Sequence, residues 1–172
     1  MSRIFALGIA TTLLLAGSLR AETKVTISGT HLCCGQCLRA VDATLKDMQG
    51  VAHKSSQEAK TIELTCENDE AAQKAVNALA AAGFYGKTNS DKVKYADVAA
   101  GKEAVEKLDV EGVHNCCGAC TTAIKKAVTG VSGVTGTSVK AKDMAFTVEG
   151  KFKPEDLVKA LLDAGFYVKI KK

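Results

Sequence analysis

One seven-residue sequence occurs twice in the chain and constrains it more than any other feature. The first copy, residues 31–37, reads HLCCGQC, and the second, residues 114–120, reads HNCCGAC, a constant 83 positions later. Six of the seven cysteines and two of the three histidines lie in these two copies. Because thiolate and imidazole are ligands for soft and borderline metal ions, we expect metal-binding chemistry at two equivalent places in the fold.

Similarity between the two halves extends well beyond the cysteine motif and sets the number of domains. Apolar positions of the first half recur at an offset of 83, and at an offset of 82 the match continues to a Gly-Phe-Tyr sequence at 83–85 and 165–167. Each repeat has about 68 residues, near the lower limit for a domain with its own core. We therefore predict a first domain over residues 22–88, a linker over 89–103 and a second domain over 104–172.

Periodicity within each repeat predicts the first two elements. Alternating apolar residues at 23–28 and 106–111 are typical of half-buried strands. Apolar spacings of three and four then predict a helix that starts at the last cysteine of each motif. Gly50 and Gly133 are expected to end these helices.

The second half of each repeat predicts a hairpin, a helix and a last strand. The hairpin is clearest at 134–148, with alternate residues of 144–148 facing inward. The remaining expectations are second helices at 69–82 and 154–164, with Pro154 in the first turn, last strands beginning at Phe84 and Phe166, and a very short edge strand near Val93. The order βαββαβ predicts an α+β fold of two tandem ferredoxin-like domains, each an antiparallel four-stranded sheet with two helices on one face.

The first 21 residues have the features of a secretory signal peptide. Arg3 is followed by an apolar run over 4–16 and by a small-residue cleavage region over 17–21. The apolar run is too short to span a bilayer of roughly 30 Å as a helix. We therefore predict a periplasmic or secreted protein with no membrane anchor after cleavage.

Charge gives little reason to expect a nucleic acid partner. The formal net charge of the whole chain is +4, and cleavage after Ala21 would remove Arg3 and Arg20 and leave +2. The sequence also lacks a basic stripe with interleaved aromatic residues, which is the usual pattern of a nucleic-acid-binding surface. Nothing in it indicates paired acid–base catalytic residues, so we expect no enzymatic activity.

The spacing of the motif cysteines suits metal binding. Cys34 and Cys37 lie three residues apart where a helix begins, so both sulfurs can point to one side, and the positive end of the helix dipole favours their thiolate forms. Gly35 leaves the loop free of a bulky side chain. Cys33 precedes this pair directly, and use of all three thiols would require a bent loop or a second metal ion.

The βαββαβ repeat with a cysteine pair before its first helix resembles the heavy-metal-associated domain. That family includes copper chaperones, the periplasmic mercury-binding protein and the amino-terminal domains of metal-pumping P-type ATPases. The resemblance places the family's Cys-x-x-Cys pair on Cys34/Cys37 and on Cys117/Cys120. It implies a metal-ion carrier, chaperone or scavenger, with a metal transporter or an acceptor metalloprotein as partner. The motif departs from the family's usual Gly-Met-x-Cys, because an additional thiol and an imidazole precede the cysteine pair.

These residues define a candidate ligand set and leave its metal open. Two thiolates would suit Cu(I) or Hg(II), whereas three thiolates and a histidine would also suit Zn(II) or Cd(II), and we expect one ion per domain. The predicted ligands are His31, Cys33, Cys34, Cys37, His114, Cys116, Cys117 and Cys120.

Other interpretations remain open for particular residues. Paired cysteines in an exported protein also occur as disulfides, and Cys-Gly-x-Cys at a helix start also resembles a thioredoxin-type redox motif. The chain has no tryptophan, and its only proline is Pro154, so a thiol–disulfide redox protein is the alternative rather than the preferred function. We expect Cys66 to be a buried small hydrophobe, His53 to lie on the surface, and Phe84 and Phe166 to belong to the core and shield the metal loops.

Overall fold

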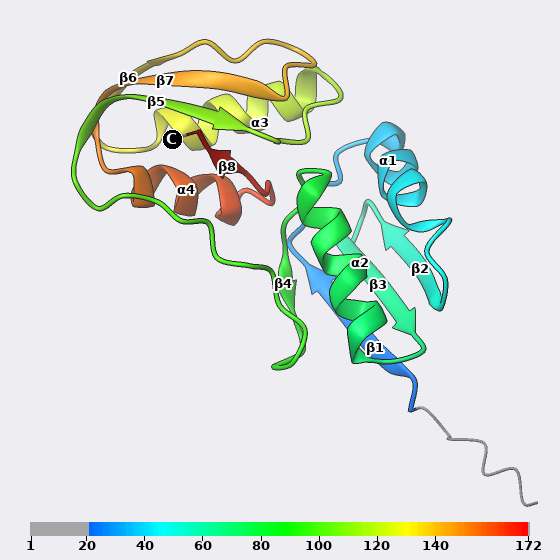
Figure 1. Ribbon diagram of the computed structural model, residues 1–172. Coiled ribbons are helices and arrows are strands. Elements are labelled where there is room, and N and C mark those ends of the chain that lie inside the picture. Colours follow the sequence, from blue (N-terminus) through cyan, green and yellow to red (C-terminus); the bar gives the residue numbers. More distant parts are fainter. Residues whose placement is uncertain (1–20, 172) are drawn as a thin grey trace, which may run out of the picture.

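The computed structural model describes residues 21–171 and contains two four-stranded antiparallel sheets, each accompanied by two helices (Figure 1). The predicted signal peptide, residues 1–21, lies outside the described residues except for Ala21. Among residues 21–171, no helix has the length and apolar character needed to cross a membrane. The first domain consists of β1 (Thr23–Ser28), α1 (Gly35–Leu45), β2 (Val51–Ser56), β3 (Thr61–Cys66), α2 (Asp69–Ala81) and β4 (Lys87–Thr88).

The second domain repeats the same order of elements. It consists of β5 (Val105–Glu111), α3 (Gly118–Thr129), β6 (Val134–Thr137), β7 (Ala145–Phe152), α4 (Pro154–Asp163) and β8 (Lys169–Ile170). The strand orders are β2-β3-β1-β4 and β6-β7-β5-β8, so corresponding strands hold corresponding places. The predicted α+β fold of two tandem ferredoxin-like domains is confirmed.

Amphipathic helices and alternating strands build each core. On α1 the buried residues are Cys37, Val41 and Leu45, which recur at spacings of four and therefore share one face. On β1, Val25 and Ile27 point inward with at most 1% of their surface exposed. Pro154 is the first residue of α4, as predicted, where its missing N–H has no helical partner to lose.

The ends of the first helices differ from prediction. Both begin two residues before the last motif cysteine, because Cys34 and Cys117 have extended backbones, with φ of −159° and −153°, and act as N-caps. They also end early, at Leu45 and Thr129. The prediction that Gly50 ends α1 is wrong: its φ of +70° serves the turn into β2, and a side chain there would collide with Glu67.

Three strand predictions also need correction. The last strands are short and begin at Lys87 and Lys169, after the aromatic residues that were expected to start them. No strand forms in the described segment between β4 and β5, although Val93 is fully buried there. Met144 does not face inward, since 68% of its surface is exposed, and Leu108 is only half-buried.

His53 is half-buried rather than a plain surface residue. It lies on β2, and its Nε2 is 3.4 Å from a carboxylate oxygen of Asp42 on α1. The residue therefore contributes to the contact between α1 and the sheet.

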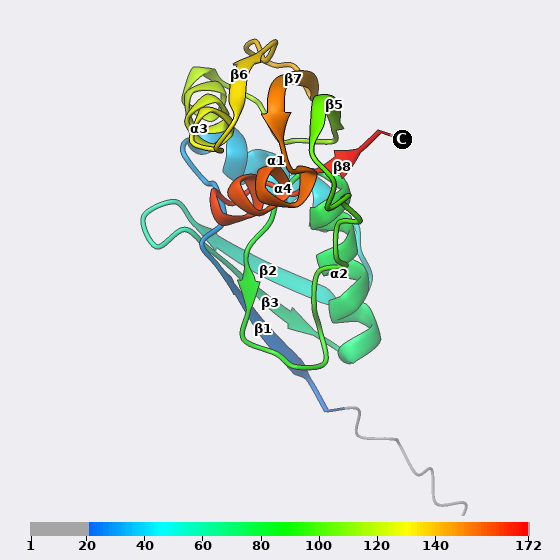
Figure 2. The same cartoon turned by 90° about the vertical axis from the view of Figure 1, so that its left-hand side faces the viewer.

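The segment between the two sheets packs against both domains. The ring of Tyr95 lies 5.0 Å from that of Tyr85 and 5.9 Å from that of Tyr167. The hydroxyl of Tyr167 donates a hydrogen bond to the carbonyl oxygen of Ala96, at 3.0 Å. In Figure 2 the second domain lies above the first, and this segment runs between them. The connecting segment therefore contacts both domains, because its Tyr95 packs on Tyr85 of the first and on Tyr167 of the second.

Candidate metal centre

The two cysteine motifs belong to different domains, as predicted, but they meet at one place. Phe84 and Phe166 form an antiparallel β-bridge between the domains. The Tyr85 N–H donates to the carbonyl of Gly165 at 3.2 Å, and the Tyr167 N–H donates to the carbonyl of Gly83 at 3.0 Å. This pairing brings the loop before α1 against the loop before α3, and the expected spatial separation of the two motifs is therefore wrong.

Glycine is required on both sides of this contact. Gly83 and Gly165 have φ of +82° and +87°, values that L-residues rarely adopt. A Cβ on Gly83 would lie 2.2 Å from the backbone nitrogen of His114, and one on Gly165 would lie 2.4 Å from the backbone nitrogen of His31. The backbones of the two domains can approach this closely only because neither position has a side chain.

The start of each helix gathers the three cysteines of its motif. Since Cys34 is extended and the helix begins immediately after it, the chain bends and brings all three thiols of the first motif together. The Sγ atom of Cys37 lies 3.7 Å from that of Cys33 and 4.0 Å from that of Cys34. The second motif repeats this arrangement, with Cys120 lying 3.8 Å from Cys116 and 3.7 Å from Cys117.

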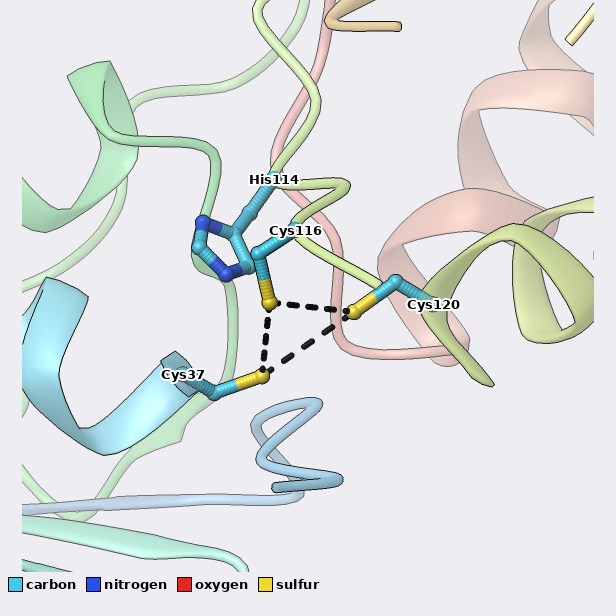
Figure 3. Close-up of side chains that lie close together, drawn as sticks. All are labelled: Cys37, His114, Cys116 and Cys120. Atoms are coloured by element: carbon cyan, nitrogen blue, oxygen red, sulfur yellow. Dashed lines mark hydrogen bonds between the residues drawn. The ribbon is translucent and has the colours of Figure 1, made fainter. Parts of the chain in front are cut away.

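Sulfur atoms of the two motifs are as close across the interface as within a motif. Cys33 Sγ lies 3.5 Å from Cys117 Sγ and 3.4 Å from Cys120 Sγ. Cys37 Sγ lies 3.6 Å from Cys116 Sγ and 3.9 Å from Cys120 Sγ. Figure 3 shows the sulfurs of Cys37, Cys116 and Cys120 pointing toward one another from the two domains. All six motif cysteines therefore belong to one cluster.

Both motif histidines border this cluster and contact the opposite domain. His31 stacks on Phe166 with ring centroids 4.4 Å apart, and His114 stacks on Phe84 at 4.1 Å. A ring nitrogen of His114 lies within 4.8 Å of the Cys37, Cys116 and Cys120 sulfurs, and His31 has a similar relation to Cys33 and Cys120. Figure 3 shows the His114 ring beside these three cysteines. The phenylalanines are fully buried, as expected, and cover the imidazole faces.

The histidine nitrogens are available as ligands. The Nε2 atoms of His31 and His114 are buried and have no hydrogen-bond partner among the described residues. Burial lowers the pKa of His31, so that its imidazole is neutral and has a free lone pair over a wider pH range. A buried polar nitrogen without a partner is costly, and a metal ion would satisfy it.

Hydrogen bonding and burial divide the thiols into acidic and weakly acidic groups. The Cys120 thiol donates to Cys37, which lowers the pKa of Cys37 well below its usual value and raises that of Cys120. The backbone N–H of Cys120 lowers the pKa of Cys117 to about 6. Burial raises the pKa of Cys33, and that of Cys116 to about 12. Metal binding would therefore have to displace protons from several thiols.

Burial differs among the six cysteines of the cluster. Cys37 and Cys120 are fully buried, whereas Cys33, Cys34, Cys116 and Cys117 are partly exposed. All six are free thiols, and so is Cys66. Cys66 lies at the end of β3 with 1% of its surface exposed, and it belongs to none of the ligand groups that the described residues form, which confirms its expected place in the core.

Sequence reasoning missed two features that shape the centre. One is the glycine pair, Gly83 and Gly165, whose signal was available: Gly-Phe-Tyr is identical in both repeats, although a strand would not need that identity. The other is Asn115, which is 4% exposed and donates from Nδ2 to the carbonyls of Lys140 and Asp143, at 2.8 and 3.0 Å. Asparagine occurs in only one of the two motifs, because the equivalent position of the first motif is Leu32, so the sequence gave no such signal for it.

Comparisons with known proteins identify similar solved structures. No protein-family model matches the chain. No curated protein matches it either. The copper-binding domain of HMA7, a P-type ATPase, has 28% sequence identity and a TM-score of 0.37, and the match covers 40% of this chain and 96% of that domain. Oxidized MerP from Ralstonia metallidurans CH34 has 27% identity and a TM-score of 0.36, covering 39% and 97% of the two chains.

One further structure spans both domains. The N-terminal soluble domains of Bacillus subtilis CopA have 22% identity and a TM-score of 0.32, and the match covers 89% of this chain and 96% of that one. The similar structures include heavy-metal-associated domains, the family that the repeated motif resembles.

Proposed function

We propose that this chain is an exported, non-enzymatic metal-binding protein that carries or scavenges a soft metal ion. One observation supports the proposal above all others: six cysteine sulfurs and two unpartnered imidazole nitrogens converge at the interface of the two domains. Such a set of ligands suits Cu(I), Zn(II), Cd(II) or Hg(II), and does not suit hard ions such as Mg²⁺ or Ca²⁺, which take oxygen ligands.

The arrangement of the thiols favours metal binding over thiol–disulfide exchange. In an exchange protein, one cysteine of a pair attacks a substrate disulfide and its partner resolves the mixed disulfide. Here Cys37 lies closer to Cys33 and to Cys116 than to its own pair member Cys34. A thiol with four close sulfur neighbours is suited to share metal ions and has no single exchange partner.

The partner of such a carrier would be a protein that takes up or supplies the ion. Four partly exposed cysteines give an acceptor's thiols access to the cluster. A metal transporter or an acceptor metalloprotein with its own thiolate ligands fits this chemistry, because an ion can then pass between thiolates without entering water. Export rests on the signal-like residues 1–21.

Anaerobic titration of the reduced protein would test the proposed function. Residues 22–172 would be titrated with Cu(I), Zn(II), Cd(II) and Hg(II) against competing chelators, with thiol protection from alkylation as a second measurement. We expect tight uptake of at least one of these ions and no reduction of insulin disulfides. Cys66→Val is the matched control, because it removes the one cysteine outside the cluster and should leave uptake unchanged. Insulin reduction at a thioredoxin-like rate without metal uptake would contradict the proposal.

Export needs its own measurement. We expect the protein recovered from its native source to begin at residue 22 and to be found outside the cytoplasm. N-terminal sequencing of the protein from fractionated cells would show this, and an uncleaved chain in the cytoplasmic fraction would exclude export.

A further inference from the structure

The six motif sulfurs have a specific polyhedral arrangement, and this inference rests on the proposed function of binding soft metal ions. Nine of their sulfur–sulfur distances are 3.4–4.0 Å. Three more pairs lie within 4.8 Å of each other: Cys33 with Cys34, Cys34 with Cys116, and Cys116 with Cys117. The cluster is therefore a network in which each sulfur has four close neighbours.

Among these six described residues, three pairs of sulfurs make no hydrogen-bond contact and share none of these ligand groups. The pairs are Cys33 with Cys116, Cys34 with Cys120, and Cys37 with Cys117. Six points in which each has four neighbours and one opposite point form an octahedron. Its faces are triangles of mutually close sulfurs, and each triangle is a candidate for a three-coordinate metal site.

The size of the triangles fits three-coordinate thiolate binding. The triangle of Cys33, Cys117 and Cys120 has edges of 3.5, 3.4 and 3.7 Å. The triangle of Cys37, Cys116 and Cys120, drawn in Figure 3, has edges of 3.6, 3.9 and 3.8 Å. A metal ion about 2.3 Å from each of three sulfurs needs edges of about 4 Å when it lies in their plane.

An octahedron of sulfurs also discriminates between metals. A tetrahedral Zn(II) or Cd(II) site needs four mutually close donors, and any four sulfurs of an octahedron include an opposite pair. Such a site is therefore available only where a histidine joins three thiols, as His114 can at Cys37, Cys116 and Cys120. Linear binding by a cysteine pair needs sulfurs about 4.6 Å apart, at a metal–sulfur distance of about 2.3 Å. Cys34 and Cys37 are 4.0 Å apart, and Cys117 and Cys120 are 3.7 Å apart. Three-coordinate Cu(I), a soft ion that thiolates select, fits best.

We propose that the six cysteines form one cage that holds four Cu(I) ions, shared by the two domains. One ion would occupy each of four alternate faces of the octahedron, so that every thiolate bridges two ions. The faces are Cys33/Cys34/Cys37, Cys33/Cys117/Cys120, Cys34/Cys116/Cys117 and Cys37/Cys116/Cys120. His114 and His31 border two of these faces and can supply a fourth ligand there.

The charges of such a cluster suit its surroundings. Four Cu(I) ions and six thiolates have a net charge of −2, all thiol protons pass to the solvent, and no electron is transferred when copper is supplied as Cu(I). Cys34 and Cys117, at the caps of α1 and α3, make no side-chain capping hydrogen bond. Because these two cysteines lie at the N-terminal ends of the helices, the positive ends of both helix dipoles lie at the cluster and stabilise its negative charge.

Native mass spectrometry and copper X-ray absorption of the full mature chain would test the cage. The reduced protein would be titrated anaerobically with the acetonitrile complex of Cu(I). We expect four coppers per chain, bound cooperatively, with three sulfurs around each copper and a copper–copper scattering contribution. Two coppers per chain, bound independently and without that contribution, would overturn the cage but leave soft-metal binding intact. If the protein bound no Cu(I), the cage would be overturned. If it bound none of Cu(I), Zn(II), Cd(II) and Hg(II), the proposed function would be overturned as well.

A double variant separates the cage from two independent pairs. Cys33 and Cys116 are opposite corners, so every face contains one of them, whereas both Cys-x-x-Cys pairs lack them. The number of coppers bound per chain should therefore fall from four to no more than two in Cys33→Ser/Cys116→Ser, and the copper–copper scattering contribution should be lost. Cys66→Val, the control, should keep four. Circular dichroism would verify that the double variant folds. If it does not fold, Cys33→Ser and Cys116→Ser would be tested singly, since each removes a ligand from two of the four copper-holding faces. Copper numbers equal in the wild type and these variants would overturn the cage.

Discussion

The imidazole of His31, in the first domain, stacks on the ring of Phe166, in the second, with their centroids 4.4 Å apart. His114 and Phe84 repeat the relationship in the opposite direction, at 4.1 Å. Each histidine is therefore positioned by the domain to which it does not belong. A ligand held in this way depends on the docking of the two domains.

Replacing Phe166 should change the surroundings of His31 without unfolding the protein. Phe166→Leu keeps an apolar side chain but removes the stacked ring, which should cost about 1 kcal/mol for the lost ring pair in addition to the lost burial. We expect a shift of the His31 imidazole signals in NMR spectra of the metal-free protein. Phe152→Leu is the matched control, since Phe152 is a buried phenylalanine of the same domain that stacks on no histidine. Equal shifts of His31 in both variants would contradict the assigned role.

Gly83→Ala should separate the two domains. A methyl group at this position would lie 2.2 Å from the backbone nitrogen of His114, and a backbone atom cannot move away as a side chain can. Gly29→Ala is the control, because Gly29 has a similar φ of +79° but open space around a Cβ. Both variants should lose about 1 kcal/mol to backbone strain.

Only Gly83→Ala should also change the shape of the molecule. Small-angle X-ray scattering of the reduced, metal-free protein should show a larger radius of gyration for Gly83→Ala than for the wild type and for Gly29→Ala. An unchanged radius for Gly83→Ala would show that the interface tolerates the methyl group.

The sequence predicted what local patterns determine. The order of strands and helices follows from periodicity, which arises within a few residues, and the candidate ligands follow from a motif that occurs twice. The helix starts were displaced because Cys34 and Cys117 have no polar side chain typical of an N-cap, yet they occupy that position. Gly50 was assigned to the wrong turn, because a positive φ serves a strand entry as well as a helix end.

The docking of the domains could not be predicted in the same way. Each repeat shows the same apolar pattern for its own core, and that pattern has no information on how two cores are oriented. The contact depends on backbone hydrogen bonds, such as that from Tyr167 to the carbonyl of Gly83, and any sequence can supply these groups. The same interface makes one six-sulfur cluster from two motifs that look independent in the sequence.

Asn115→Ala should destabilise the second domain by about 1–3 kcal/mol, the usual cost of leaving buried polar groups unpaired. The Asn115 amide donates to two loop carbonyls, and its oxygen accepts a hydrogen bond from Thr121 at 2.8 Å. Chemical unfolding of the metal-free protein would measure the loss. Thr122→Ala is the control, because this exposed hydroxyl bonds only within α3, to Gly118, and its removal should cost less than 0.5 kcal/mol or so. Equal losses would show that Asn115 does not hold the loop.

Cys66 should make the metal-free protein less stable at alkaline pH. Burial raises the pKa of this thiol from 9.0, so the folded state keeps the proton at a pH where the unfolded state releases it. Stability is therefore fully present below pH 9 and falls as the pH rises above it, by up to about 1.4 kcal/mol per pH unit for this group. Cys66→Val should remove this contribution, and valine fits because Val148 is buried at the equivalent position of β7.

The pH dependence of the difference between the two proteins isolates Cys66. The pKa values of the buried Tyr95 and of five motif cysteines are also shifted, but these groups are common to wild type and variant and cancel in the comparison. Unfolding of both reduced proteins would be measured at about pH 8 and about pH 10.5, on either side of the unfolded thiol's pKa. Between these two pH values the wild type should lose more stability than Cys66→Val. Parallel pH profiles would show that Cys66 ionises as readily in the folded state as in the unfolded chain.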